Sequence, residues 1–211
     1  MTTTRKPTPT DLREACLTEA LAVIAETGIE QLSLREVARR LGVSHQAPYK
    51  HFPSRDHILA EVVARCFDGF AAFLETADRS GAPPEALGAL GLAYFAYARA
   101  HPLEYRLMFN TPLPDGAKHP AMMQRARYAF ELLERSIARM TLQPLAPVSV
   151  PLDALFVWST IHGLASILQS DTLEKLGLSP AERDGAIARC MARIGLALAP
   201  ENSISAYHSP P

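Results

Sequence analysis

Residues 44–51, with the sequence SHQAPYKH, carry side chains that can make hydrogen bonds and apolar contacts with the edges of DNA bases. The carboxamide of Gln46 can form two hydrogen bonds with adenine, and Ala47 and the ring of Pro48 can contact the methyl group of thymine. His45 can donate a hydrogen bond to a base or to a phosphate. This chemistry predicts a segment that reads a DNA sequence, provided that the fold presents these side chains at the front of a helix.

A second group of side chains suits the sugar-phosphate backbone of DNA. Lysine, arginine, tyrosine and serine all contact phosphate oxygens in protein–DNA complexes. Arg55 would do so at the first turn of a helix, where backbone N–H groups also favour an anion. Packing within the protein is an equal alternative for Tyr49, and a solvated position is an alternative for His51. The residues that complete the predicted DNA-binding set are Ser33, Arg35, Ser44, Tyr49, Lys50, His51 and Arg55.

The distribution of charge favours a DNA-binding surface in this region only. The 211 residues have a formal net charge of −1, which by itself carries no nucleic-acid signal. Between residues 33 and 55, however, five Lys or Arg residues stand against a single acid, Glu36. A local excess of positive charge attracts phosphate groups. A solvated basic surface that binds nothing is the alternative interpretation.

Short helices must position these residues. Apolar spacing predicts a first helix over residues 11–27, with Thr10 as its N-cap. The capping box formed by Ser33 and Glu36 predicts the start of a second helix of about two turns. Gly42 is typical of the end of such a helix, because glycine adopts the left-handed backbone conformation at little cost.

The second helix is followed by a tight turn at residues 42–44 and by a third helix that we expect from Ser44. Two helices joined by so short a turn, on a supporting first helix, are typical of a helix-turn-helix. Pro48 would lie in the first turn of the third helix, where its missing N–H removes at most one intrahelical bond. We therefore expect this helix to form with an irregular first turn and to present the ring of Pro48.

The rest of the chain also predicts helices, and no segment shows the alternation of a β-strand. A long helix is expected over residues 55–78, with Ser54 as its N-cap. Proline near a first helical position marks five further starts. The sequence therefore predicts an all-α fold of about nine helices. The prolines that mark the later starts are Pro84, Pro102, Pro120, Pro151 and Pro180.

Several classes of function find no support in the sequence. No paired acids, Ser-His-Asp set, phosphate loop or metal-ligand cluster stands out, so we expect no enzyme, metal site or cofactor. Cys16, Cys66 and Cys190 fall in apolar helical patterns, as buried free thiols of a reducing compartment do. We find no secretory signal and no uninterrupted apolar stretch of about 18 residues, and therefore expect a cytoplasmic protein without a membrane span.

Residues 10–59 resemble the N-terminal domain of the tetracycline-repressor (TetR) family. The resemblance is carried by Gly-Val-Ser at 42–44, by Tyr-Lys-His-Phe at 49–52, and by Arg55 shortly before a long helix. Pro48 departs from the pattern, because many members carry leucine at this position. Further along the chain, Trp158, His162 and Gly163 in FVWSTIHGLASIL resemble the Trp-His-Gly signature of one subgroup of these regulators.

The resemblance implies two domains, a helix-turn-helix DNA-binding domain over residues 1–56 and a helical bundle for ligand binding and dimerisation over residues 57–211. It also implies a function. The protein would be a ligand-responsive transcriptional regulator, in the first instance a repressor that binds a palindromic DNA operator as a homodimer. A small apolar or aromatic effector of unknown identity would release it.

Two C-terminal helices each carry two apolar faces, which predicts a neighbour on both sides. In the last helix, a bulky stripe lies beside a stripe of small residues. We interpret the two helices as half of an intersubunit four-helix bundle, as the resemblance also implies. Burial of both faces within one chain is the alternative, and for His162 we favour a hydrogen-bonded core or interface position over a metal ligand. The predicted interface residues are Leu155, Trp158, His162, Ala188, Met191, Ala192 and Gly195.

Aromatic side chains crowd the middle of the chain, and most of them must belong to the core. Tyrosines among them suggest a cavity with polar groups, and in the family that the chain resembles the corresponding helices enclose an effector pocket. Four arginines at positions 99, 106, 125 and 127 could meet an acidic group, although simple solvation is favoured. The predicted pocket residues are Phe67, Phe70, Tyr94, Tyr97, Tyr105, Phe109, Tyr128 and Phe156.

Two other classes of function remain open on the sequence. One is a DNA-bound scaffold that recruits another protein and responds to no small molecule. The other, less favoured, is a helical enzyme or small-molecule carrier whose N-terminal module is vestigial.

Overall fold

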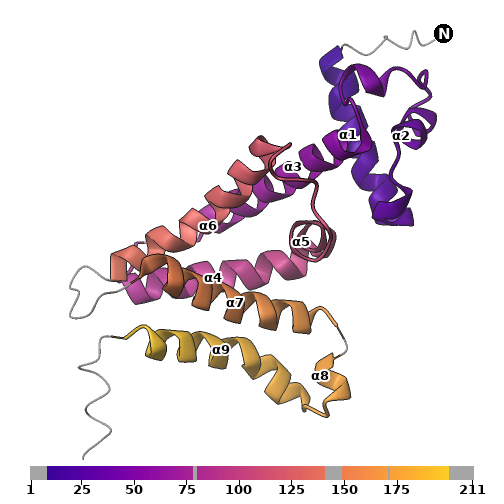
Figure 1. Cartoon of the computed structure of the whole chain (residues 1–211). Coiled ribbons are helices and arrows are strands. Elements are labelled where there is room, and N and C mark those ends of the chain that lie inside the picture. The colour runs from indigo at the N-terminus through magenta and orange to yellow at the C-terminus, as the bar shows by residue number, and fades with distance from the viewer. Residues whose placement is uncertain (1–8, 78–79, 141–148, 171, 200–211) are drawn as a thin grey trace, which may run out of the picture. The chain divides into compact units, whose positions relative to one another are not determined.

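The computed structural model describes residues 9–77, 80–140, 149–170 and 172–199. Within these residues the chain forms nine α-helices, two short 3-10 helices and no β-strand, which confirms the predicted all-α fold (Figure 1). The α-helices are α1 (Pro9–Thr27), α2 (Leu34–Arg40), α3 (Arg55–Glu75), α4 (Pro83–Ala100), α5 (Pro102–Phe109), α6 (Pro120–Met140), α7 (Val150–Leu168), α8 (Thr172–Lys175) and α9 (Pro180–Ala197), and the 3-10 helices are η1 (Ile29–Gln31) and η2 (Pro48–Lys50).

Proline opens most of the helices, because its fixed backbone angle suits the first helical position and its missing N–H has no partner there anyway. The starts of α5, α6 and α9 at proline agree with the prediction. Helix α4 begins one residue earlier than expected, at Pro83, and α7 begins at Val150 with Pro151 second. Helix α1 also begins at a proline, Pro9, so Thr10 lies inside the helix and is not its N-cap.

Serines cap two further helices, and the first of them agrees with the prediction. The hydroxyl of Ser54 accepts the backbone N–H of His57 at 3.4 Å at the start of α3. At the start of α9, Ser179 and Glu182 form a complete capping box, in which each side chain accepts the other residue's backbone N–H at 2.8 and 3.3 Å. Such caps satisfy N–H groups that have no partner within the helix.

The number of helices agrees with the sequence-based expectation, but the set of helices differs. Helix α8 is not among the predicted helices; it is a single turn that ends at Lys175 and is followed by Gly177, whose φ of 73° is the left-handed conformation common after a helix C-terminus. In contrast, the helix expected from Ser44 is not an α-helix. Helix α3 ends at Glu75, before the predicted end at residue 78.

The chain divides into two compact units. The first, which we call the head unit, contains the residues up to Asp68 together with Leu103–Ala126. The second, the body unit, contains Gly69–Pro102 and the residues from Arg127 onward. Helices α3 and α6 therefore each contribute residues to both units.

In the head unit, α1 packs on η1, α2 and η2. Its buried face contains Leu17, Ala20 and Ile24, whereas Leu21 is only half-buried. The free thiols of Cys16 and Cys66 are buried as expected. Burial raises the pKa of the Cys66 thiol to about 12, which keeps it protonated and unreactive.

In the body unit, α4, α7 and α9 pack on one another, and α7 and α9 lie side by side in Figure 1. One face of α7, with Ala154, Val157, Ile161 and Ala165, is buried in the chain. Among the described residues, α7 is also the one helix whose length and composition would suffice to cross a membrane, a test that interior helices of other proteins pass as well.

Candidate nucleic-acid interface

Helix α2 is held at both ends by its own sequence. The Ser33 hydroxyl accepts the backbone N–H of Glu36 at 3.1 Å, so Ser33 acts as the N-cap. At the other end, Val43 donates its N–H to the carbonyl of Ala38 at 3.0 Å and Gly42 donates to Arg39 at 3.2 Å. With Gly42 at a φ of 64°, these bonds form a Schellman motif, which turns the chain sharply out of the helix.

The segment after this turn differs from the predicted helix because of Pro48. An α-helix from Ser44 would bond the N–H of residue 48 to the Ser44 carbonyl, and proline has no N–H. Instead, Ala47 donates to that carbonyl at 2.9 Å, which tightens the chain by one residue. The result is a turn over residues 45–47 followed by the single 3-10 turn η2.

The position of Pro48 also contradicts the expectation that its ring is presented at the surface. Its ring is buried, so it does not face solvent in the way that contact with a thymine methyl would need. Next to it, Phe52 is 2% exposed and belongs to the core, with the guanidinium of Arg13 over its ring at 5.6 Å. Pro48 and Phe52 therefore pack η2 and the residues after it against the rest of the head unit.

The local excess of positive charge is smaller than the sequence suggested. Glu36 accepts hydrogen bonds from Arg39 at 2.6 and 2.8 Å and from Arg40 at 2.9 Å, and these two guanidiniums lower the pKa of its carboxyl to about 2. Arg40 also contacts Glu26 at 2.8 Å and Glu19 at 3.4 Å. Both acids lie outside the stretch counted above and come from α1. Arg40 thus holds α2 against α1.

The side chain of Arg55 also makes hydrogen bonds within the protein. Its Nε donates to the carbonyl of Leu32 at 3.0 Å and its Nη2 donates to the carbonyl of Ile29 at 2.6 Å. The guanidinium therefore ties η1 and the residue after it to the first residue of α3. The side chain stays 41% exposed, and its contact with a phosphate remains a prediction.

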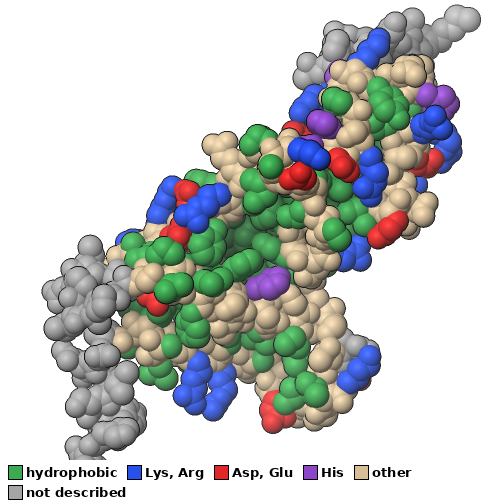
Figure 2. Space-filling model, in the orientation of Figure 1, with side chains coloured by type: hydrophobic (Ala, Val, Ile, Leu, Met, Phe, Trp, Pro, Cys, Tyr) green, Lys and Arg blue, Asp and Glu red, His purple; other side chains and the backbone are tan. Residues whose placement is uncertain are grey.

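Arg35 and Lys50 are the cations of this stretch that keep their charge available. Both side chains are exposed, and neither has an ion-pair or hydrogen-bond partner in the part of the chain that the structure describes. In the space-filling view, basic, acidic and histidine side chains all appear on the visible face of the head unit (Figure 2). The mixed charge follows from the ion pairs just described.

The predicted DNA-binding residues thus fall into separate groups. Ser44, His45, Gln46, Tyr49 and Lys50 are exposed around η2, with Tyr49 at 42%. Ala47 and His51 are half-buried, and Ser33 is engaged as the N-cap of α2. The exposed group combines base-reading and phosphate-binding side chains on one short segment. Its contacts with DNA remain predictions.

The predicted pocket residues are divided between the two units. Phe67, Tyr105 and Phe109 belong to the head unit, where Phe109 packs on both other rings at 5.8 and 5.1 Å. The other five belong to the body unit, where Phe70 packs edge-on against Tyr94 at 5.3 Å. None of the eight lines the groove that α4, α7 and α9 form in the body unit. That groove was not predicted from the sequence, because its lining residues come from segments that lie far apart along the chain.

The predicted interface residues separate by face. On α9, the small residues Ala188, Ala192 and Gly195 are exposed, while Ile194 of the bulky stripe is buried. Met191 is half-buried and lies against Gly91 of α4, and its place in the interface remains a prediction.

On α7, Leu155 is 49% exposed, and Trp158 and His162 are half-buried. The Trp158 ring packs on Phe130 of α6 at 6.0 Å. Leu155 is therefore the predicted residue of α7 that most clearly stays open for a partner.

Comparison with known proteins agrees with this architecture. Residues 17–62 match "Bacterial regulatory proteins, tetR family", and residues 87–194, about half of the chain, match "Tetracyclin repressor-like, C-terminal domain". A solved structure of a protein with unknown function from Rhodococcus sp. RHA1 shares the fold, with a TM-score of 0.75, 24% identity and coverage of 95% of this chain and 100% of that chain.

Two relatives are regulators by name. The uncharacterized HTH-type transcriptional regulator Rv0681 of Mycobacterium tuberculosis is 24% identical over 164 residues, which cover 78% of this chain and 73% of the relative. The HTH-type transcriptional repressor KstR of Mycolicibacterium smegmatis is 32% identical over 72 residues, 34% of this chain and 35% of the relative. The chain belongs to the TetR family of transcriptional regulators, whose helix-turn-helix binds DNA.

Proposed function

We propose that this regulator represses transcription by binding a palindromic operator as a homodimer, and that a small apolar or aromatic molecule releases it. Residues 1–56 would form the DNA-binding domain and residues 57–211 the ligand-binding and dimerisation domain, acting in the cytoplasm. The relative KstR is named as a transcriptional repressor, which supports the sign of the regulation. One helix-turn-helix covers too little DNA for tight binding, and such proteins usually pair on half-sites about 34 Å apart.

The proposed dimer is supported chiefly by the exposed second face of α7 and of α9. Each helix packs one face within the chain and leaves the other open, with Leu155 on α7 and Ala188, Ala192 and Gly195 on α9. Small side chains let another helix approach closely, and burial of an apolar side chain such as Leu155 lowers the free energy of the dimer. A twofold pairing of these two helices would complete a four-helix bundle.

Release by an effector would act through α3. This helix contributes residues to both units, since its residues up to Asp68 belong to the head unit and those from Gly69 to the body unit. Its first residue, Arg55, is tied to η1 and to Leu32. A ligand that favours a different position of α3 would change the separation of the two heads of a dimer, and the heads could then not both engage the operator.

The test begins with an operator selected from a genomic library by binding to the protein. Sedimentation equilibrium and gel shifts should then show a dimer bound to one duplex, and transcription in vitro from that operator should fall when the protein is added. Ala192→Glu should produce a monomer that no longer shifts the operator, because it places a charge in the proposed interface. Ala72→Glu, the same change at an exposed position of α3, is the matched control and should leave both properties intact.

Each arm of the test has an outcome that rejects the proposal. A wild-type protein that is monomeric at every practical concentration would reject the dimer. A compound panel and cell extracts that neither raise the melting temperature nor release the operator would reject ligand control and favour a DNA-bound scaffold. Increased transcription in vitro would reverse the sign of the regulation.

A further inference from the structure

Helices α4, α7 and α9 of the body unit border a partly open groove of about 430 Å³. Sites for small molecules in proteins are roughly 300–1,000 Å³ in volume, so the groove is large enough for such a ligand. Alanines at positions 96, 98 and 165 explain the hollow, because their short side chains leave the space between the helices unfilled. At one end, Gln169 of α7 donates a hydrogen bond from Nε2 to the carbonyl of Ala98 at 3.2 Å and joins two of the walls.

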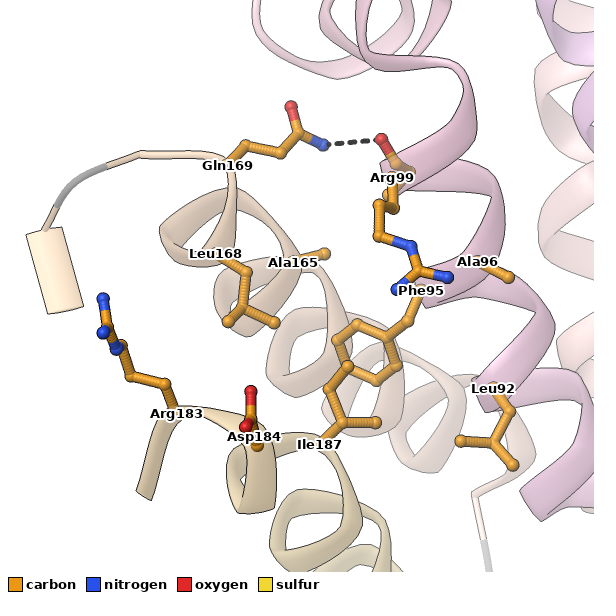
Figure 3. A pocket seen from close by; sticks show the side chains of 11 residues that line it. Leu92, Phe95, Ala96, Arg99, Ala165, Leu168, Gln169, Arg183, Asp184 and Ile187 are labelled. Carbon is orange, nitrogen blue, oxygen red and sulfur yellow. Dashed lines mark hydrogen bonds between the residues drawn. The ribbon is translucent and has the colours of Figure 1, made fainter. Parts of the chain in front are cut away.

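The floor of the groove is apolar. Figure 3 shows Phe95 reaching it from α4, Leu168 from α7 and Ile187 from α9. Phe95 is already largely buried, whereas Leu168 and Ile187 are half-buried and would lose more contact with water if a ligand covered them. Covering apolar surface favours binding by about 25 cal/mol per Å². The floor therefore suits a hydrocarbon chain or ring.

Two arginines at the margin of the groove have no acidic partner among the described residues. Arg99 of α4 and Arg183 of α9 lie on opposite sides of it in Figure 3, and neither takes part in an ion pair or side-chain hydrogen bond in the described part of the chain. Several other arginines in the described part of the chain are paired with acids. Arg125 contacts Asp68 at 2.7 Å and Arg127 contacts Glu134 at 2.6 Å.

One acid limits the charge of the ligand. Asp184 also lines the groove, so its charged residues are two arginines and one aspartate, with a formal sum of +1. A single negative charge balances this sum, whereas a polyphosphate would bring an excess of negative charge next to Asp184. Guanidinium groups bind carboxylates through two parallel hydrogen bonds, a geometry that ammonium groups cannot offer.

We propose that this groove binds an apolar molecule with one carboxylate, whose hydrocarbon part covers Phe95, Leu168 and Ile187 and whose carboxylate pairs with Arg99 or Arg183. The proposed ligand is an anion, and none of the predicted pocket residues lines the groove that would bind it. The binding itself is independent of DNA. Its use as a signal that releases the operator rests on the function proposed above.

Calorimetric titration of the full chain without DNA tests the site with two probes, decanoate and its neutral analogue decanamide. Wild-type protein should bind decanoate about fivefold more tightly than decanamide, which corresponds to a favourable ion pair of a solvent-accessible guanidinium. The preference should disappear in Arg99→Ala, in Arg183→Ala or in the double variant, and Arg99→Lys should retain part of it. Arg106→Ala, which removes an exposed arginine of the head unit, is the control and should preserve the preference.

A second variant tests the floor separately from the charge. Ala96→Phe fills the groove and should weaken the binding of both probes to a similar extent, with a melting curve that shows an intact fold. Equal affinity of wild-type protein for the two probes would overturn the proposal, and so would an unchanged preference in the double arginine variant. Unchanged binding in Ala96→Phe would place the probes elsewhere.

Gel shifts with the selected operator separate this proposal from the proposed function. If decanoate binds in the groove but leaves the operator complex intact, the site stands and its role in release fails. If another compound releases the operator while decanoate does not bind, the sensor function stands and the groove assignment fails.

Discussion

The hydroxyl of Tyr94 on α4 lies 3.1 Å from Nδ1 of His162 on α7. The contact joins two helices of the body unit and gives His162 a hydrogen-bonded interior position. On sequence grounds, a hydrogen-bonded position of this kind is favoured for His162 over a role as a metal ligand. Desolvation by burial lowers the pKa of its imidazole below the ordinary value.

The lowered pKa of His162 predicts a loss of stability in mild acid. As the pH falls, the unfolded chain takes up a proton on this side chain at about pH 6.5, before the folded chain does. The stability that depends on neutral His162 is therefore fully present above that pH and is lost as the pH falls through the folded pKa. Melting temperatures from about pH 7.5 to pH 5 should fall more steeply for wild-type protein than for His162→Gln.

An exposed histidine of the head unit, His45, provides the control for this pH dependence. His45→Gln should keep the wild-type dependence, because His45 is exposed. Parallel curves for wild-type protein and His162→Gln would show that the Tyr94–His162 pair does not contribute to it.

Two glycine-to-alanine substitutions should change stability in opposite directions. Gly42 has a φ of 64°, a conformation that alanine adopts only with strain, so Gly42→Ala should destabilise the head unit by about 1 kcal/mol although no atom obstructs the new methyl group. Gly88 lies within α4 with open space around its Cα, and Gly88→Ala should stabilise the chain by about 0.5–1 kcal/mol. Urea unfolding of both variants would check the signs, and a stabilising Gly42→Ala would contradict the assigned turn.

Loss of the Lys50 charge should weaken binding to every DNA sequence alike. Each phosphate contact releases counterions, so Lys50→Ala should reduce the slope of log affinity against log salt by about 0.9. The melting temperature should not change, because the side chain is exposed and unpaired in the described residues. Lys118→Ala removes another exposed lysine of the head unit, one that pairs with Asp115, and should leave the slope as it is. An unchanged slope in Lys50→Ala would remove Lys50 from the phosphate-binding residues.

Arg55→Ala should mainly lower the folding stability of the protein, and its direct effect on DNA binding should be smaller. The substitution removes the donors to the carbonyls of Leu32 and Ile29, and we expect a loss of about 1–2 kcal/mol after allowing for the partial exposure of the guanidinium. Chemical denaturation of the variant measures this loss. If the stability is unchanged and the salt slope of DNA binding falls instead, Arg55 is a phosphate ligand and its contacts with the two carbonyls matter little.

The helices of this protein could be predicted because their signals are local. Proline at a first turn, a serine that accepts an N–H three residues later and a glycine just after a last turn act within one or two helical turns. Periodicity likewise separated the two faces of α7 and α9, since the residues that share a face are three or four apart. The same local logic failed at Pro48, where one missing N–H was enough to replace the α-helix with a turn and a 3-10 helix.

The sequence by itself therefore determined the all-helical architecture, the helix-turn-helix position and the residues on each helix face. Only the tertiary structure decided which charges are available, because Arg40 and Arg55 also have partners that lie 14 to 26 residues away along the chain. It also decided that Arg99 and Arg183, 84 positions apart, border one groove. Ion pairs and cavities depend on which helix faces meet, and this is a property of packing that no local pattern of residues encodes.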